Sequence, residues 1–196
     1  MVYRIIRIVV KIWLSLRFRI KVEGLNLIPN DGCILAMNHR SYYDSLLVGV
    51  HTPRKMFIMA KEELFNNKIV SWVIRQMGAF PVKRNSADIK SLKHSLKLID
   101  EGNIFSIFIE GTRSKSEEML DPKKGIGFLV AKSKSPVVPV LIQGVTGGWF
   151  SKVTVRFGAP IDFNGEEYDE IAKKVANAIK SLAIKNQLGT TRSMGP

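Results

Sequence analysis

The chain has 196 residues, 45% of them hydrophobic, with 30 Lys and Arg against 17 Asp and Glu and a formal net charge of +13. This length fits one ordinary domain with a substantial core, and the excess of positive charge favours anionic partners such as phospholipid headgroups, nucleic acid or an acidic carrier protein. The single cysteine excludes an internal disulfide, which is compatible with a cytosolic compartment.

The first 16 residues predict an amphipathic helix. At about 100° per residue, Arg4, Arg7 and Lys11 fall on one narrow stripe. Much of the remaining surface is apolar and is formed by Ile5, Ile8, Val9, Ile12, Trp13 and Leu16. A bilayer span needs about 20 mainly apolar residues, and no small-residue cleavage site follows, so we expect neither a membrane span nor a secretory signal peptide. Residues 1–16 are typical of a helix that lies in a membrane interface. The alternative is a helix packed on the domain with its basic stripe in water.

From residue 17 onward, predicted strands and helices follow one another. Strands are indicated by polar and apolar alternation in residues 17–23 and by apolar runs in residues 33–37, 104–109, 137–142 and 153–157. Helices are indicated over residues 42–50, 86–101, 124–134 and 166–184. This order predicts a single α/β domain over residues 17–186, with a mixed, largely parallel sheet flanked by helices and preceded by the amphipathic helix. The polar residues 187–196 are expected to form a flexible tail.

The turn after the strand of residues 33–37 carries a histidine and an aspartate that could act as a pair. His39 lies in this turn, and Asp44 lies in the first turn of the next helix if that helix begins near Ser41. An aspartate beside a histidine can fix its tautomer and stabilise its charged form, which suits the histidine to act as a base. The spacing Ser41-x-x-Asp44 also fits a capping box, in which Asp44 only satisfies the first backbone N–H groups of the helix. Both interpretations remain open at this point.

A second polar group follows the apolar run of residues 104–109. Such a run is typical of a strand buried on both faces of a parallel sheet, and ligands of open α/β sheets bind beyond the carboxyl ends of the strands. Gly111 would let the backbone approach a ligand closely, and Arg113 offers a planar fork suited to a phosphate. Glu110 could either hold that fork or bind a substrate hydroxyl. The alternative is a salt bridge in a loop at the strand end.

Four short blocks resemble, in the same order, the motifs of the 1-acylglycerol-3-phosphate acyltransferases, or PlsC family, within the glycerolipid acyltransferases. They are residues 38–44 (Asn-His-x4-Asp), 78–84 (Gly-Ala-Phe-Pro-Val-Lys-Arg), 108–114 (Phe-Ile-Glu-Gly-Thr-Arg-Ser) and 137–140 (Val-Val-Pro-Val). Two positions depart from the family pattern, since Ile109 stands where proline is common and Lys83 where an acidic residue is frequent. Neither departure removes a proposed catalytic group.

The resemblance implies an enzyme that moves a fatty acyl group from a thioester donor to the free hydroxyl of lysophosphatidic acid, making phosphatidic acid in phospholipid biosynthesis. His39 would take the hydroxyl proton, and Asp44 would orient the imidazole. Arg84 and Arg113 would hold the acceptor phosphate, while Pro139 would shape the site. The complete set of substrate-binding residues that the resemblance implies is Asn38, Lys83, Arg84, Glu110, Gly111, Thr112, Arg113 and Pro139. Asn38 could cap the helix, orient the loop or stabilise the oxyanion.

We expect no bound cofactor and no metal site, because the three histidines are scattered without ligand spacing. The donor would be acyl-CoA or an acyl carrier protein, bound as a substrate. Positive charge and the predicted N-terminal helix favour a peripheral or monotopic enzyme at the cytoplasmic face of a membrane, on an anionic phospholipid surface.

Alternatives within the enzyme class are transfer to glycerol-3-phosphate or to another lysophospholipid. A basic module that only binds lipid or nucleic acid is the alternative from another class. No nucleic-acid partner is expected, because no zinc pattern, RNP-like strand or helix-turn-helix signature accompanies the charge.

Overall fold

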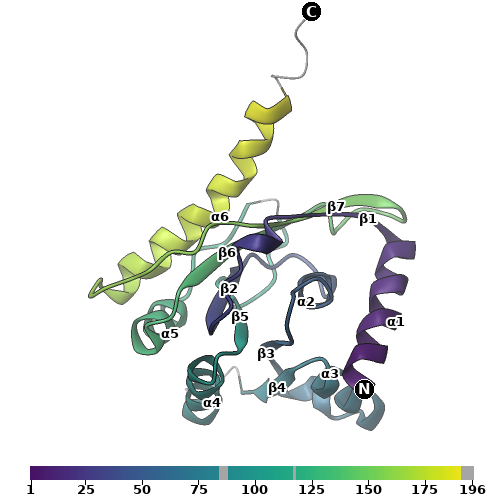
Figure 1. Cartoon of the computed structure of the whole chain (residues 1–196), viewed down its shortest axis with the longest axis horizontal. Helices are drawn as coiled ribbons and strands as arrows, with labels where there is room; N and C mark the ends of the chain where they lie inside the picture. Colours follow the sequence, from purple (N-terminus) through teal and green to yellow (C-terminus); the bar gives the residue numbers. More distant parts are fainter. Residues whose placement is uncertain (84–87, 117, 191–196) are drawn as a thin grey trace, which may run out of the picture.

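The computed structural model of the chain describes residues 1–83, 88–116 and 118–190 (Figure 1). In chain order its elements are α1 (Val2–Arg17), β1 (Phe18–Glu23), the 3-10 turn η1 (Leu25–Leu27), β2 (Cys33–Met37), α2 (Tyr43–Gly49), β3 (Met56–Lys61), the 3-10 turn η2 (Glu62–Phe65), α3 (Lys68–Gln76), β4 (Ala79–Val82), α4 (Ile89–Asp100), β5 (Ile104–Phe108), α5 (Lys124–Ser133), β6 (Val137–Gln143), β7 (Ser151–Phe157) and α6 (Tyr168–Thr190).

The strands form one seven-stranded sheet in the order β1-β7-β6-β2-β5-β3-β4. Each neighbouring pair is parallel except β6 and β7, which are antiparallel. The prediction of a single α/β domain with a mixed, largely parallel sheet is therefore confirmed. Because β2 lies between β5 and β6, the loop that follows β2 leaves the centre of the sheet, where ligands of such folds bind.

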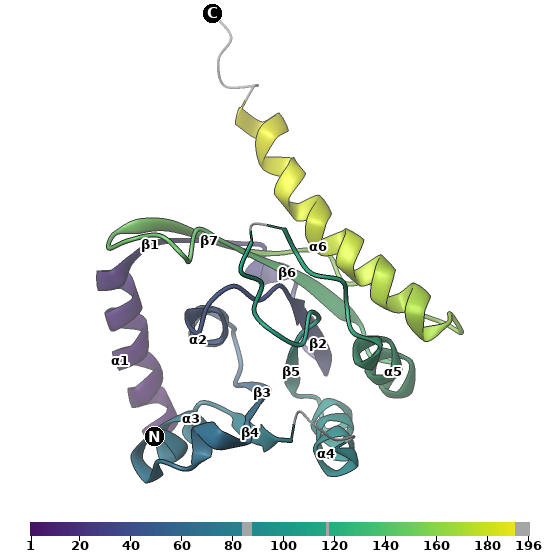
Figure 2. The same cartoon turned by 180° about the vertical axis from the view of Figure 1, so that it is seen from behind.

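Helices cover both faces of the sheet, as Figures 1 and 2 show from opposite sides. On one face, α4, α5 and α6 pack on the alternate residues Ile34 and Ala36 of β2. On the other face, α1 and α2 pack on Cys33, Leu35 and Met37. The five residues of β2 are all fully buried, which agrees with a central strand covered on both sides.

Helix α1 packs on the domain through a narrow side and leaves its apolar face in solvent. Leu14 is fully buried, and the guanidinium of Arg7 donates to the carbonyl oxygens of Val50 at 3.1 Å and Thr52 at 2.6 Å. The exposed apolar residues of the helix are Val2, Ile5, Ile8, Val9, Ile12, Trp13 and Leu16. The helix is thus packed on the domain, but the side in contact is not the predicted apolar face. Among the described residues, no helix combines the length and apolar character needed to cross a bilayer.

The predicted ends of two helices differ from the observed ones. The predicted helix over residues 86–101 begins at Ile89, with the Asp88 side chain accepting from the Ser91 N–H at 3.0 Å. The last helix continues to Thr190 instead of ending at residue 184, because extending a formed helix costs little once it is nucleated and no proline interrupts residues 185–190. The predicted start of the tail at residue 187 therefore falls inside α6, and residues 191–196 lie outside the described residues.

Candidate active site

Two loops meet at the carboxyl edge of the sheet. Strands β2 and β5 run parallel in direct register, with Met37 opposite Phe108. The segments that follow them, residues 38–44 and 109–114, therefore emerge side by side. The backbone links them twice, through the Ile109 N–H to the Met37 carbonyl at 3.1 Å and the Ser114 N–H to the His39 carbonyl at 2.9 Å. The two predicted polar groups form one site.

His39 and Asp44 are in contact within this site. Nδ1 of His39 lies 2.9 Å from Oδ2 of Asp44, and the two residues are 8% and 0% exposed. Since a carboxylate can only accept, Nδ1 carries the hydrogen and Nε2 of a neutral imidazole keeps its lone pair. The ring stacks on Phe108 with a centroid distance of 3.7 Å, which restricts its rotation. A base with a fixed tautomer is the arrangement that proton abstraction requires.

The capping interpretation of Asp44 also holds in the same structure. Oδ2 of Asp44 accepts from the backbone N–H groups of Arg40 at 2.6 Å and Ser41 at 2.7 Å, in addition to the imidazole. These bonds satisfy donors before the first turn of α2 and bend the chain so that His39 returns toward Asp44. Orientation of the imidazole and capping are therefore two functions of one carboxylate oxygen.

Glu110 joins the backbones of two loops. Its Oε1 accepts from the His39 N–H at 2.7 Å, its Oε2 accepts from the Leu120 N–H at 2.8 Å, and the residue is 1% exposed. The side-chain pair with Arg113 that the sequence allowed does not form among the described residues. Both carboxylate oxygens already have partners, so this geometry favours a positioning role over contact with a substrate hydroxyl.

The Asn38 side chain is hydrogen-bonded to β6, the neighbour of β2 on the side opposite β5. Its amide nitrogen donates to the Ile142 carbonyl at 3.0 Å, and its amide oxygen accepts from the Ile142 N–H at 2.8 Å. The side chain thereby extends the pairing of β2 with β6 by one further step. Of the three roles that the sequence left open for Asn38, orientation of the loop is the one that this geometry favours.

Arg113 lies at the mouth of a cavity beside His39. Its guanidinium stacks over the Tyr42 ring at 3.7 Å and donates to the Tyr42 hydroxyl at 2.8 Å. Both residues are exposed, so the guanidinium can still reach an anion from solvent. Gly111 has a backbone φ of +67°, a left-handed conformation that glycine adopts at low cost, and Thr112 is exposed beside it.

Two further predicted residues, Lys83 and Pro139, do not line this cavity. Lys83 is exposed at the end of β4, where it lines a different depression with Asp88 and Ser91. Pro139 is buried inside β6 opposite Ala36, and its carbonyl accepts from the Gly158 N–H at 2.8 Å. Arg84 lies outside the described residues.

The cavity beside His39 has a volume of about 290 Å³ and mostly apolar walls. Its lining includes Gly49 of α2, Met56 and Ile58 of β3, and Ile74 and Met77 from the α3 region. These residues are not predicted from the sequence, because apolar side chains that line a cavity have the same pattern as those that fill a core. Only the packing of β3, α3 and β4 around His39 distinguishes them.

Cys33, His51 and His94 do not line the cavity beside His39. Cys33 is fully buried in β2, and burial raises the pKa of its thiol to about 11. His94 is exposed, whereas His51 is half-buried and burial lowers its pKa. Within the described ranges, no group of three or more His, Cys, Asp or Glu side chains could hold a metal ion.

Comparison with known proteins gives concordant results. The family model described as Acyltransferase matches residues 19–143. A 1-acyl-sn-glycerol-3-phosphate acyltransferase of Bacillus subtilis is 36% identical over 140 residues, covering 70% of this chain and 69% of the relative. One of the same name from Streptococcus pneumoniae is 31% identical over 184 residues, covering 89% and 68%. The crystal structure of the 1-acyl-sn-glycerophosphate (LPA) acyltransferase PlsC from Thermotoga maritima aligns with a TM-score of 0.79 at 27% identity, over 95% of this chain and 80% of that one.

Proposed function

The chain belongs to the acyltransferase family, and from this premise we propose that it transfers a fatty acyl group from a thioester donor to the free hydroxyl of lysophosphatidic acid, which yields phosphatidic acid. The observation that carries the chemistry is the contact of 2.9 Å between His39 and Asp44, which leaves Nε2 of the imidazole free on the side of an apolar cavity. It is therefore an enzyme of the 1-acyl-sn-glycerol-3-phosphate O-acyltransferase type.

We propose His39 as the general base. Its Nε2 takes the proton of the acceptor hydroxyl while that oxygen attacks the thioester carbonyl, and a tetrahedral intermediate forms. The imidazolium is stabilised by Asp44, which already accepts from Nδ1. When the intermediate collapses, the carbon–sulfur bond breaks and the imidazolium proton goes to the leaving thiolate. The products are the acylated acceptor and the free thiol, so no acyl-enzyme is required.

The apolar cavity beside His39 is a suitable site for the acyl chain. Its buried end is lined by Gly49 and by Met56, which is 3% exposed, while Tyr42 and Arg113 stand at the exposed end. A chain bound with its carbonyl beside His39 would extend toward Gly49 and Met56. Burial of each methylene contributes about 0.8 kcal/mol, so this cavity supplies binding energy that orients the reacting carbonyl.

The acceptor phosphate is assigned to the rim around Arg113. The exposed guanidinium is held in place by Tyr42 and can present two parallel N–H donors to a phosphate. Gly111 and Thr112 border this rim, and the positive charges of Lys83 and Arg84 are proposed to attract the acceptor. Asn38 and Glu110 are proposed as positioning residues, and Pro139 as a structural residue of β6.

A membrane surface is the proposed source of the acceptor. The exposed apolar face of α1 lies beside two other apolar segments, the α3 residues Ile69 and Trp72 and the loop residues Trp149 and Phe150. Helices α1 and α3 are in contact, and the Phe150 N–H donates to the Arg17 carbonyl at 2.9 Å. Exposed Arg4 and Lys11 accompany the α1 face. This combination supports peripheral association with an anionic phospholipid surface on the cytoplasmic side.

Acyl-CoA or an acyl carrier protein is the proposed donor, and the transfer needs no bound cofactor. The test is transfer from labelled acyl-CoA and acyl carrier protein to lysophosphatidic acid in vesicles, with glycerol-3-phosphate and other lysophospholipids as alternative acceptors. Phosphatidic acid from wild type but not from His39→Ala is expected. No product with either donor and any acceptor would contradict the proposal.

A further inference from the structure

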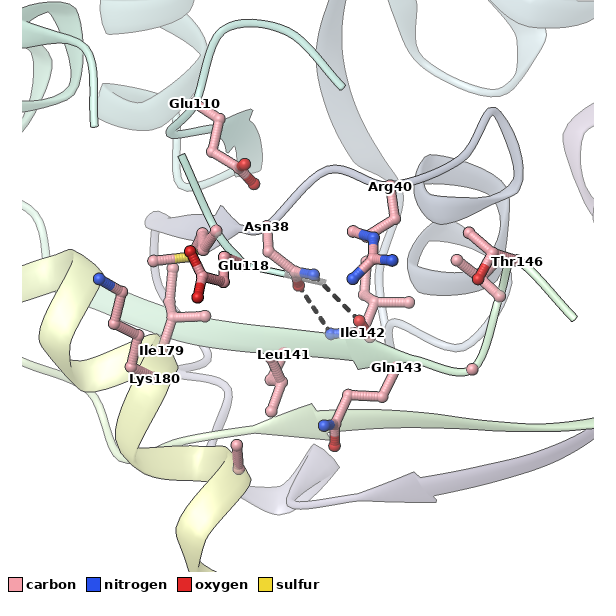
Figure 3. Close-up of a pocket in the computed structure, with 14 residues that line it drawn as sticks. Asn38, Arg40, Glu110, Glu118, Leu141, Ile142, Gln143, Thr146, Ile179 and Lys180 are labelled. Carbon is pink, nitrogen blue, oxygen red and sulfur yellow. Dashed lines mark hydrogen bonds between the residues drawn. The ribbon is translucent and has the colours of Figure 1, made fainter. Parts of the chain in front are cut away.

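A second cavity lies across the His39 loop from the first one. It has a volume of about 550 Å³ and lies between this loop, the carboxyl end of β6 and the helix α6 (Figure 3). Successive residues of the loop line different cavities, since Asn38 and Arg40 line this one and His39 lines the other. Both of these lining residues are chain neighbours of His39, so the cavity adjoins the loop that carries the proposed catalytic imidazole.

Arg40 is the unusual side chain of this cavity. Figure 3 shows it extending from the loop toward Ile142 and the cavity interior. Its Nε is buried without a hydrogen-bond partner, and its guanidinium makes no ion pair among the described residues. Arg7 and Arg54 instead donate to backbone carbonyls, and Arg156, although its Nη2 is also buried without a partner, pairs with Glu23. A buried guanidinium donor without a protein partner is costly, which indicates that an external group satisfies it.

The rest of the lining offers further polar groups without partners in the described structure. Lys180 of α6, Gln143 and Thr146 also line this cavity and make no side-chain hydrogen bonds there, with Lys180 across the cavity from Arg40 (Figure 3). Two carboxylates are also present. The Glu110 carboxylate accepts from two backbone N–H groups, and the Glu118 carboxylate is exposed, so water and salt screen its repulsion of an anion.

We propose that this cavity binds a phosphate group of the acyl donor, with Arg40 as its main cation and Lys180 as a second cation of the lining. The inference rests on the proposed function, because it assigns the occupant to the reaction of His39. A guanidinium presents paired donors at the spacing of phosphate oxygens, and the donor carries phosphate in its phosphopantetheine arm, whereas the single phosphate of the acceptor is assigned to Arg113. Binding here would anchor the donor beside the loop that carries His39.

The test compares Arg40→Gln with wild type in steady-state kinetics, varying acyl-CoA and lysophosphatidic acid separately. We expect the KM for acyl-CoA to rise by about tenfold or more, as loss of a charge-assisted contact predicts, with kcat at saturation changed far less. Acyl-pantetheine, a donor without phosphate, is the control, because wild type and variant should use it equally if the donor phosphate binds at Arg40. A raised KM for lysophosphatidic acid in the variant, with the KM for acyl-CoA unchanged, would contradict the proposal.

Two other cavity variants and one control variant test the proposal even if Arg40→Gln does not fold. Lys180→Ala should raise the KM for acyl-CoA by a smaller factor, whereas Lys173→Ala, two turns earlier on α6 and outside the cavity lining, should not. Thr146→Glu, at an exposed lining position, should raise that KM by placing negative charge in the cavity. Unchanged KM values for both substrates in all the cavity variants would overturn this inference while wild-type activity upholds the proposed function. Inactive wild type would instead refute the proposed function.

Discussion

Oδ2 of Asp44 accepts three hydrogen bonds, one from Nδ1 of His39 at 2.9 Å and two from the backbone of the intervening turn. The same oxygen therefore fixes the imidazole and the bend that brings the imidazole to it. In a straight helix, residues five apart diverge by about 140°, so this contact exists only because the turn precedes α2. The orientation of the proposed base and the fold of the turn therefore depend on the same carboxylate oxygen.

Asp44→Asn tests this dependence. The amide keeps one acceptor oxygen but cannot stabilise a charged imidazole, so we expect kcat to fall by about 10²–10⁴-fold. We also expect a loss of about 1 kcal/mol in the free energy of unfolding, because the turn loses part of its cap. Rate assays and thermal unfolding measure the two effects. Asp100→Asn, at an exposed position, is the control. A folded variant with wild-type kcat would refute the assignment of Asp44.

Glu110→Gln separates positioning from substrate binding. One of the two backbone donors would face an amide NH₂ instead of an oxygen, and an unsatisfied buried group costs about 1–3 kcal/mol. We expect lower thermal stability and lower kcat, with the KM for lysophosphatidic acid nearly unchanged. Glu167→Gln, at an exposed position that lines neither cavity, should leave both constants unaltered. The opposite pattern, a raised KM for lysophosphatidic acid with unchanged kcat, would indicate that Glu110 binds the substrate.

Gly49→Leu should shorten the preferred acyl chain. A Cβ at Gly49 would meet only the terminal methyl of Met56, at 3.3 Å, so a larger side chain can enter the cavity. Displacing about two methylenes would lower kcat/KM for the longest donors by about tenfold to twentyfold and leave short donors unaffected. A series of acyl-CoA lengths measures this shift. Gly125→Leu, where a Cβ has no neighbour within 4 Å, is the matched helical control. An unchanged length profile would place the acyl chain elsewhere.

Replacing Ile8 and Ile12 of α1 with serine should weaken binding to anionic vesicles. These side chains are 58% and 57% exposed, so their loss removes surface available to a bilayer without opening the core. We expect about tenfold or greater weakening in a sedimentation assay, since burial of an isoleucine contributes about 1.5–3 kcal/mol. Leu27→Ser with Ile89→Ser removes exposed apolar residues elsewhere and is the control. Equal vesicle binding by both double variants would argue against α1 as the contact.

Cys33 should be unreactive in the folded protein. Burial raises the pKa of its thiol from 9.0 to about 11, so the folded state binds this proton more tightly than the unfolded state. Its contribution to stability is therefore present below pH 9 and is lost as pH rises toward 11. At pH 8 we expect a disulfide reagent to label the native protein far more slowly than the protein in denaturant. Equal labelling rates would show that β2 opens readily.

The sequence by itself was sufficient for the order of the main elements and for the two loops that carry the polar residues. Apolar runs such as residues 33–37 and 104–109 identify buried strands, because a strand covered on both faces carries apolar side chains on both of them. The strands after residue 55 and before residue 83 were not predicted, since short segments with mixed composition carry little periodic signal. The family resemblance added the pairing of His39 with Asp44 to a list of otherwise ambiguous polar residues.

Tertiary structure alone decided how those residues divide their roles. Glu110, Asn38 and Arg113 all stand at strand ends in the sequence, yet two of them bind backbone groups and only Arg113 reaches solvent beside His39. Likewise, the apolar residues of α1 favour a membrane face but also fit a buried one, and their exposure follows from which side of the helix Leu14 and Arg7 use for packing. The physical reason is that hydrophobicity and spacing define which surfaces can be buried, whereas the partner that buries them comes from segments distant in the chain.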